Sequence, residues 1–280
     1  ADQTDKIHAA IEKLASGETS YKVDVNDFSS LEAELAEGLN RISDGLETAL
    51  AEQVKSERLK ADLITNVSHD IKTPLTSIIN YVDLIKRQHI EDPTVQKYLE
   101  VLDQKSQRLK TLTEDLVEAS RASSGNIKLE ITNIDFVELV QQTTGEFEEK
   151  YAIRHLEIVN TLPNEVIMIE ADGRMLWRVL ENLYNNAFKY ALEGTRVYVT
   201  IEDHGADVVF TIKNVSANPL NISPDELTER FVRGDVSRTT EGSGLGLSIA
   251  KDLTTLQGGK FELIIDGDLF KAQITFPIKN

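Results

Sequence analysis

Apolar residues recur every three or four positions through most of the first 124 residues, which is the spacing of amphipathic helices. Within residues 31–49 the steps alternate between three and four, as in a coiled-coil seam. A second stripe follows, and it consists of Ile64, Val67, Ile71, Leu75, Ile78, Val82 and Ile85. A third begins after Pro93, a residue suited to the first turn of a helix, and stops near Gly125. The pattern predicts a coiled-coil segment followed by two long helices joined by a short loop.

A helical hairpin of this kind cannot cover its own apolar face. Burying that face requires further helices, and a second copy of the same hairpin supplies two of them. We therefore expect a homodimer in which two hairpins form a four-helix bundle.

The pattern changes near residue 125. Short runs rich in β-branched residues replace the helical stripes, at residues 127–131, 156–159, 166–169, 197–201 and 208–212. Helical patterns lie between them at residues 135–150, 172–191 and roughly 246–257, and Asp135 with Glu138 forms a capping-box pattern at the first. Residues 203–206 and 266–268 have the composition of hairpin turns. The second half is predicted to be an α/β sandwich, with helices over a mostly antiparallel sheet.

Composition narrows the function classes. The formal net charge is −17, which argues against nucleic acid and against binding to anionic lipid. The chain has no cysteine, so a disulfide framework and a thiolate metal site are excluded. No apolar run reaches the roughly 18 residues of a membrane span, and no N-terminal signal pattern is present, so we expect this chain to be soluble.

One ionisable pair interrupts the second stripe. At about 100° per residue, His69 lies roughly 160° from the centre of that stripe, and Asp70 follows it directly. Thr73 comes one turn later and shares the face of His69. The spacing predicts that this face points at solvent or at a partner, and not into the core.

Two stretches of the second half indicate phosphate chemistry. On the predicted helix 172–191, Asn182, Asn186 and Lys189 share one face. Amide oxygens suit Mg²⁺, and a lysine suits phosphate, although a plain polar surface is the alternative. Gly242, Gly244 and Gly246 precede the last helix, where exposed backbone N–H groups can receive an anion. Neither the Walker A pattern nor the dinucleotide fingerprint fits this loop, and a flexible linker is its alternative.

Together these motifs resemble the sensor histidine kinases of two-component systems. S-H-D-I-K-T-P-L (residues 68–75) is similar to the H-box, residues 181–190 to the N-box, 228–235 to the F-box, and G-S-G-L-G-L (242–247) to the second glycine box. The resemblance implies a dimerisation and phosphotransfer hairpin at 59–124 and a Bergerat-type ATP-binding domain at 125–280. Residues 1–58 resemble, less specifically, a HAMP module with a signalling helix, and a plain coiled coil is the alternative there.

The resemblance also implies roles for single residues. His69 would be the phosphoacceptor, Asp70 would orient the proton on its ring, and Thr73 would assist dephosphorylation of a response regulator. Asn182 and Asn186 would hold Mg²⁺. The remaining residues expected to contact ATP are Lys189, Tyr190, Asn214, Arg233, Gly242, Gly244, Leu245, Gly246 and Leu247.

The sequence departs from the family at one motif. The first glycine box should read D-x-G-x-G, but residues 214–218 read N-V-S-A-N. The aspartate of the family accepts a hydrogen bond from the exocyclic amine of adenine. Asn214 offers one neutral amide oxygen in its place, so we expect a working kinase with modest nucleotide affinity.

The resemblance implies ATP and Mg²⁺ as cofactors, and a homodimer and a cognate response regulator as partners. HAMP modules normally follow a transmembrane helix, so we expect the cytoplasmic part of a membrane sensor, with membrane contact only through a missing N-terminal transmembrane region. Two alternatives remain open. One is a scaffold or phosphatase that retains the kinase fold, and the other is a Bergerat-type ATPase, which would lack the histidine hairpin.

Overall fold

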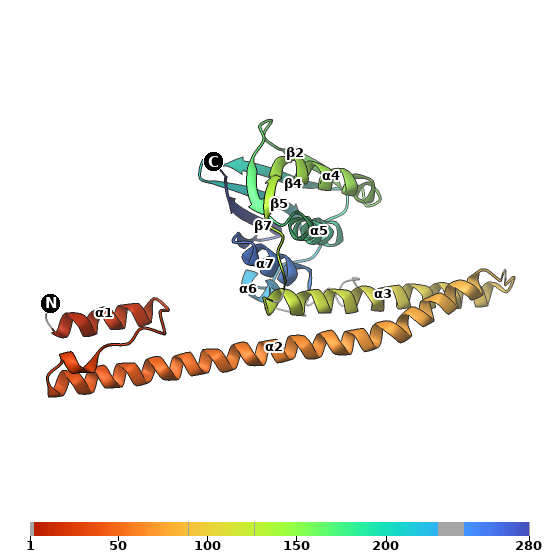
Figure 1. Ribbon diagram of the computed structural model, residues 1–280. Helices are drawn as coiled ribbons and strands as arrows, with labels where there is room; N and C mark the ends of the chain where they lie inside the picture. Colours follow the sequence, from red (N-terminus) through yellow and green to blue (C-terminus); the bar gives the residue numbers. More distant parts are fainter. Residues whose placement is uncertain (1–2, 89, 126, 229–243, 280) are drawn as a thin grey trace. The chain divides into compact units, whose positions relative to one another are not determined.

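The computed structural model describes residues 3–88, 90–125, 127–228 and 244–279. The chain separates into two compact units, residues 1–63 and 64–280. One long helix, α2 (Ser30–Lys86), contributes residues to both (Figure 1). The predicted F-box at 228–235 falls almost wholly outside the described residues, and so do Arg233 and Gly242.

The first unit is built on two helices and the segment that connects them. Helix α1 (Gln3–Ala15) is followed by a 3-10 turn, η1 (Val25–Asp27), and by the first part of α2. Three small apolar residues are buried together: Ala10 of α1, Val23 of the connecting segment and Ala36 of α2. The Asn40 side chain bonds the backbone N–H and the carbonyl of Val23, each at 2.9 Å. These contacts fix the connecting segment to α2, while the assignment of a HAMP module stays a prediction.

The hairpin of the second unit consists of the later part of α2 and of α3 (Pro93–Ser123). The Asp92 side chain caps α3 by accepting from Thr94 N at 2.8 Å, and Pro93 occupies the first turn, as the sequence predicts. Gly125, just beyond the helix, has φ = 68°. Because α2 ends at Lys86 and α3 begins at Pro93, the loop between them is short, and it lies where the sequence predicts it.

Small and apolar residues line the seam between these two helices. Every seventh residue is buried, namely Ser68, Leu75 and Val82 on α2 and Leu99, Ser106, Thr113 and Ser120 on α3. Leu75 and Val82 of the predicted apolar stripe lie in this seam, but the rest of the stripe is not covered, since Val67 is 47% exposed and Ile78 is 45% exposed. On α3, Leu102 and Leu109 are exposed to a similar extent. The hairpin thus leaves an apolar face open along its length.

The rest of the second unit is an α/β sandwich. Its elements are β1 (Thr132–Asp135), α4 (Phe136–Ala152), β2 (Glu157–Thr161), β3 (Met168–Ala171), α5 (Gly173–Tyr190), β4 (Arg196–Asp203), β5 (Asp207–Val215), α6 (Pro224–Thr228), α7 (Gly246–Leu256), β6 (Lys260–Asp266) and β7 (Leu269–Pro277). The main sheet has the order β2-β4-β5-β7-β6, and all its pairs are antiparallel except β2 with β4. A separate pair joins β1 to β3. The predicted fold class, with a mostly antiparallel sheet, is confirmed.

One predicted strand is wrong. Residues 127–131 are irregular, and the strand begins at Thr132. The Glu130 N–H donates to the Asp172 carboxylate at 2.9 Å. This backbone donor is therefore satisfied by a side chain and not by the carbonyl of a neighbouring strand. Strands β6 and β7 were not predicted, although the turn between them was recognised at residues 266–268.

Aromatic side chains fill the space between α4, α5 and the sheet. Phe136 packs edge-to-face against Phe210 and Phe276, with ring centroids 6.4 and 6.2 Å apart. The buried hydroxyl of Tyr184 lies 2.6 Å from Thr144 Oγ1, and that of Tyr151 donates to the Tyr184 carbonyl at 2.6 Å. Burial raises the pKa of both phenols, so they stay neutral. Each buried hydroxyl is therefore satisfied, which fixes α4 against α5.

Gly259, between α7 and β6, lies in a tightly packed position. A Cβ at this residue would lie 2.7 Å from Phe276 Cζ and 2.9 Å from Thr254 Cγ2. We expect Gly259→Ala to lower the free energy of unfolding by about 1–3 kcal/mol, because the core must shift to admit the methyl group. Urea unfolding followed by circular dichroism measures it.

Gly145 is the matched control, because it lies inside α4 and a Cβ at this residue would meet no atom within 4 Å. Gly145→Ala should raise stability by up to about 1 kcal/mol through helix propensity alone. Equal effects of the two substitutions would contradict the packing described for Gly259.

Candidate nucleotide and phosphoacceptor sites

Helix α5 is anchored at its first turn by two buried polar side chains. The Asp172 carboxylate accepts from the backbone N–H groups of Arg174 and Met175, each at 3.1 Å. The Asp172 N–H donates to Gln257 Oε1 at 2.9 Å, and Gln257 in turn donates to the Leu253 carbonyl at 2.9 Å. The start of α5 is thereby bound to the end of α7.

The N-terminus of α7 meets the middle of α5. Its N-cap residue is Leu245, whose apolar side chain supplies no capping bond, and an α-helix leaves the N–H groups of its first turn without intrahelical partners. A Cβ at Gly246 would lie 3.1 Å from Asn182 Oδ1, so the amide oxygen of Asn182 faces this helix end. The Nδ2 atom of Asn182 donates to the Arg178 carbonyl at 2.9 Å, which fixes the amide with its oxygen outward. Gly244, just before the helix, has φ = 73°, a conformation that favours glycine.

Asn214 lies near the end of the central strand β5, between Val197 of β4 and Phe270 of β7. It is 2% exposed, and its Nδ2 donates to the Val215 carbonyl at 3.2 Å. Its Oδ1 is buried and has no hydrogen-bond partner among the described residues. A buried acceptor without a partner costs about 1–3 kcal/mol. This oxygen is therefore a place where a ligand N–H would be stabilised.

The end of α5 is joined to the end of β5. The Leu192 N–H donates to the Val215 carbonyl and the Ala217 N–H to the Tyr190 carbonyl, both at 2.8 Å. Asn214 and Tyr190 are therefore held at the same end of the domain. Asn186 is half-buried and Lys189 is exposed on the last turns of α5. The predicted ligands from α5, β5 and α7 thus come together on one side of the sandwich, apart from Arg233 and Gly242, which lie outside the described residues.

Arg154 is a residue that the sequence reasoning missed. Its guanidinium bonds three carbonyl oxygens at the end of α5, those of Phe188, Lys189 (3.0 Å) and Ala191 (3.0 Å). It also lies over the Phe188 ring, 5.6 Å from its centroid. These carbonyls are the ones that a helix end leaves unsatisfied, so Arg154 fixes the turn that carries Lys189 and Tyr190. Its position just after a predicted helix gave no signal in the sequence.

The residues predicted for phosphotransfer lie together on α2. The side chains of His69 and Asp70 are 81% and 87% exposed, which confirms the predicted solvent-facing side. The distance from His69 Nδ1 to Asp70 Oδ1 is 3.9 Å, too long for a hydrogen bond. Thr73 Oγ1 donates to the His69 carbonyl at 3.4 Å. The helix continues through Pro74.

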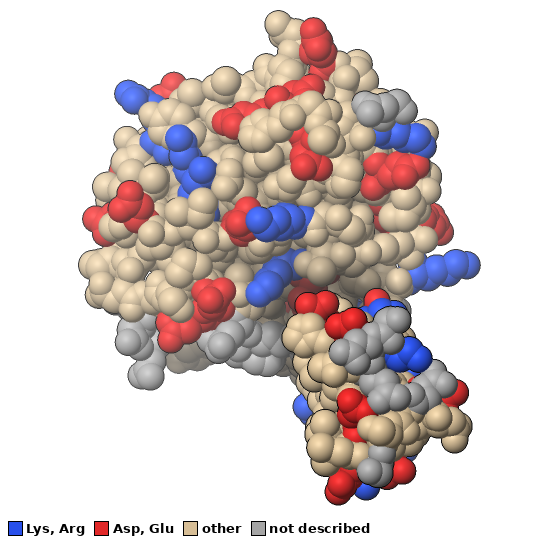
Figure 2. Space-filling model, turned by 90° about the vertical axis from the view of Figure 1, so that its left-hand side faces the viewer, with Lys and Arg blue, Asp and Glu red and all other residues tan. Residues whose placement is uncertain are grey.

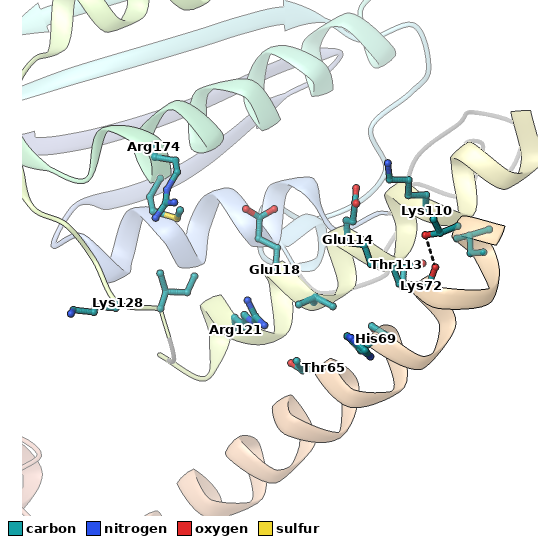
Figure 3. Close-up of a pocket in the computed structure, with 16 residues that line it drawn as sticks. Thr65, His69, Lys72, Lys110, Thr113, Glu114, Glu118, Arg121, Lys128 and Arg174 are labelled. Carbon is teal, nitrogen blue, oxygen red and sulfur yellow. Dashed lines mark hydrogen bonds between the residues drawn. The ribbon is translucent and has the colours of Figure 1, made fainter. Parts of the chain in front are cut away.

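His69 faces a cleft of about 620 Å³, which we call the His69 cleft (Figure 3). It is lined from three sides, by α2, by α3 with the segment that follows it, and by the first turn of α5. The residues lining it are Thr65, Ser68, His69, Lys72, Leu75, Thr76, Lys110, Thr113, Glu114, Val117, Glu118, Arg121, Ile127, Lys128, Arg174 and Met175. None of the predicted nucleotide ligands that the structure describes is among them.

Arg178 joins the hairpin to the α/β domain. From α5 it bonds Asp115 at 3.0 Å and Glu118 at 2.8 Å on α3, and Glu181 at 2.5 Å on its own helix. Burial lowers the pKa of Arg178, but its bonds to Glu181 and Glu118 outweigh this and raise it, so the guanidinium stays charged. Burial raises the pKa of Glu118 even though Arg178 opposes it. Ala119 and Ala122 of α3 belong to the core of the domain, so the contact is apolar as well as ionic.

Two family models match the chain. That described as "His Kinase A (phospho-acceptor) domain" matches residues 59–125, and that described as "Histidine kinase-, DNA gyrase B-, and HSP90-like ATPase" matches residues 171–279. Sensor histidine kinase WalK of Bacillus subtilis is 28% identical over 237 residues, or 82% of this chain and 39% of the relative. Sensor histidine kinase MtrB of Mycobacterium tuberculosis is 29% identical over 257 residues, or 90% of this chain and 44% of the relative. The chain thus spans less than half the length of these relatives.

Solved structures agree in fold. Full-length ShkA in complex with AMPPNP superposes with a TM-score of 0.68 at 22% identity, over 78% of this chain and 46% of that one. Histidine kinase ThkA in complex with response regulator protein TrrA superposes with a TM-score of 0.56 at 24% identity, over 83% and 67%. The two matched domains define a phosphoacceptor hairpin followed by an ATP-binding domain. The chain belongs to the sensor histidine kinases of two-component systems.

Removing the Arg154 side chain tests how far the end of α5 depends on it. We expect Arg154→Ala to lower the free energy of unfolding by about 2–4 kcal/mol, because three carbonyls lose a charged donor. Calorimetry should also show weaker binding of an ATP analogue in Arg154→Ala protein that is still folded. Arg154→Lys should recover part of both.

Arg196→Ala is the control. Arg196 is an exposed arginine of the same domain, with Nε 3.6 Å from Glu157. Its loss should change stability by less than about 1 kcal/mol. An Arg154→Ala protein that binds the analogue as tightly as the wild type would contradict the positioning role.

Proposed function

We propose that this protein is an ATP-dependent protein-histidine kinase that phosphorylates itself on His69 and passes the phosphoryl group to an aspartate of a response regulator. The observation that carries the proposal is the combination of a solvent-facing His69 on the matched phospho-acceptor hairpin with the buried Asn214 Oδ1 of the matched ATP-binding domain, which has no hydrogen-bond partner among the described residues. Two structural neighbours, one solved in complex with AMPPNP and one with a response regulator, support the same cofactor and partner.

The unsatisfied groups fit a nucleotide. The buried Asn214 Oδ1 would accept a hydrogen bond from the exocyclic amine of adenine, and the N–H groups of the first turn of α7 would bind phosphate oxygens. Lys189 and Tyr190 would meet the phosphates from the end of α5. Arg233, Gly242, Gly244, Leu245 and Leu247 are proposed to complete the site.

The metal site is proposed to consist of amide and phosphate oxygens. Among the residues that the structure describes, no group of three or more His, Cys, Asp or Glu side chains is arranged to hold a metal ion. Asn182 Oδ1 faces the N-terminus of α7, and Asn186 lies one turn further along α5. Mg²⁺ binds such oxygens while it keeps waters and phosphates as its other ligands. It would neutralise charge that develops on the phosphates during transfer.

In the proposed reaction the ring of His69 attacks the γ-phosphorus of ATP. A P–N bond forms while the P–O bond to ADP breaks, and the ring proton is held on the far side. Nδ1 faces Asp70, so Nε2 is the attacking atom, and closing the 3.9 Å gap would let the carboxylate hold the Nδ1 proton. Thr73 would align a water for dephosphorylation of the regulator.

Transfer requires the ATP-binding domain to shift along the hairpin. The His69 cleft is lined by Arg174 at the start of α5, while Asn186 lies twelve residues later. At 1.5 Å per residue this separation is about 18 Å along the helix. The contacts between Arg178 and α3 would have to break or exchange for the phosphates to approach His69.

Partners and location complete the proposal. The uncovered stripe through Val67 and Ile78 would pack against a second copy in a four-helix bundle.

None of the described helices is long and apolar enough to cross a lipid bilayer. We assign the chain to the cytoplasmic part of a membrane sensor. On the face drawn in Figure 2, acidic and basic side chains are interspersed, so this face offers no broad basic surface for nucleic acid.

A second candidate, a scaffold or phosphatase without ATP turnover, is favoured by one observation. Residue 214 is a neutral asparagine where the family has a charged aspartate, and residues 216 and 218 lack the glycines of that motif. Weak adenine binding would follow from this departure, because a charge-assisted hydrogen bond is roughly twice as strong as a neutral one.

Replacing His69 tests the main proposal. His69→Gln should abolish incorporation of label from γ-labelled ATP and leave nucleotide binding nearly unchanged, because the acceptor and the nucleotide ligands belong to different matched domains. The label on the wild type should be lost in acid, as phosphohistidine is. Acid-labile label that persists on the variant would show that His69 is not the acceptor.

Restoring the family residue separates the two candidates. We expect Asn214→Asp to tighten binding of an ATP analogue several-fold, or about 1 kcal/mol, by adding charge to the acceptor. Isothermal titration with Mg²⁺ present measures it, and Asn185→Asp, on the same domain but bonded to Lys150, is the control. A wild-type protein that binds no nucleotide at millimolar concentration would favour the scaffold.

A further inference from the structure

The lining of the His69 cleft is unusually cationic for this chain. The protein carries a net charge of −17, yet five cationic side chains line the cleft against two carboxylates. The cations are Lys72, Lys110, Arg121, Lys128 and Arg174. One of the two carboxylates, Glu118, is already bonded to Arg178 at 2.8 Å. The local charge is therefore opposite to that of the molecule as a whole.

These cations lack partners within the described part of the chain. Hydrogen bonds and ion pairs satisfy other cations of the same helices, such as Lys86 with Asp103 at 2.7 Å and Arg178 with its three carboxylates. By contrast, the side chains of the five cations form no hydrogen bond or ion pair with a described residue. Like charges gathered without counter-charges repel one another, so an anion in the cleft would relieve that repulsion.

A buried polar group also points to a ligand. Ser68, which precedes His69 and lines the cleft, is 2% exposed, and its Oγ has no hydrogen-bond partner among the described residues. A buried hydroxyl without a partner is costly, and it can donate to an anionic oxygen. In Figure 3, His69 on α2 lies across from Arg121 on α3, and Arg174 reaches down from the start of α5.

The cleft is separate from the uncovered apolar stripe. On α2 the lining residues centre roughly 120° around the helix from the stripe through Val67, Ile71 and Ile78. On α3 the corresponding angle to the exposed Leu102 and Leu109 is roughly 100°. A second copy packed on the stripe would therefore leave the cleft accessible.

We infer that the His69 cleft is a binding site for a phosphate group, held by Arg121, Arg174 and the Ser68 hydroxyl next to the imidazole of His69. Guanidinium groups bind phosphate oxygens through paired N–H donors, which suits the two arginines to this role. The phosphate group has two possible sources. One is a small free phosphate compound, and the other is the phosphoryl group carried by His69 itself. The second source rests on the proposed function, and the first does not.

The free-ligand arm uses His69→Gln protein, which cannot carry phosphohistidine, and pyrophosphate as the probe, without Mg²⁺. Adding Arg121→Gln and Arg174→Gln should weaken pyrophosphate binding about tenfold in calorimetry at low salt, because two of five cations are lost. Adding Lys97→Gln and Lys105→Gln makes the same change of charge on α3 outside the cleft, and it should alter the affinity less than twofold. Circular dichroism checks that each protein is folded. If the variant with both arginines replaced is not folded, Arg174→Gln alone takes its place in the titration.

The second arm titrates phosphorylated protein by ³¹P NMR. Cations beside the phosphoryl group favour its dianion, so Arg121→Gln with Arg174→Gln should shift its pKa upward, and the lysine pair should not. Weaker pyrophosphate binding without this shift identifies a free phosphate compound as the ligand. The shift without weaker binding identifies the group on His69. If neither the pyrophosphate affinity nor the phosphoryl pKa changes, or if the arginine and lysine variants behave alike, the cleft is not a phosphate site. If the arginine variant loses only its binding to the response regulator, the cleft is a protein-docking surface instead.

Discussion

The proposed nucleotide site depends on how α5 and α7 are fixed to each other. At one end the buried Asp172–Gln257 bond joins the start of α5 to the end of α7. Near the other end the two helices approach so closely that only a glycine fits at residue 246 without pressing on Asn182. Within the described part of the chain, Asn214 Oδ1 is buried without a hydrogen-bond partner, and the first turn of α7 carries N–H groups that a helix leaves without intrahelical partners, so both suit a polar ligand.

A second set of contacts determines where that site lies relative to the hairpin. Arg178 is one turn before Asn182 on α5, and the Asn182 amide bonds its carbonyl. The same arginine bonds Asp115 and Glu118 of α3. Docking on the hairpin and the orientation of a proposed metal ligand thus share one helical turn. A change in the contacts between Arg178 and α3 is therefore expected to alter the orientation of Asn182, and the reverse, because packed helices shift as rigid elements.

Much of this arrangement could be predicted from the sequence. The helical stripes located the hairpin, Pro93 and Gly125 marked the limits of α3, and the spacing of Asn182 and Asn186 placed them on one face. These features are local, so periodicity and capping rules reach them. The solvent-facing side of His69 followed from the same periodicity.

The rest depended on contacts between distant residues. Residues 127–131 have strand composition, but a side chain 42 positions away bonds the backbone of Glu130. Arg154 acts on carbonyls 34 to 37 residues later in the chain, and Arg178 pairs with acids about 60 residues earlier. The cationic lining of the His69 cleft likewise gathers residues from α2, α3 and α5. No local sequence pattern indicates which distant residues come into contact in the fold.

The nucleotide site is proposed to form from polar groups of α5, β5 and the first turn of α7. Amide chemical shifts of ¹⁵N-labelled protein, recorded while AMPPNP and Mg²⁺ are added, test it residue by residue. We expect the largest shifts at the backbone amides of residues 246–248 and at the side-chain amides of Asn182, Asn186 and Asn214. Shifts confined to other surfaces, with these amides unmoved at saturating nucleotide, would contradict it.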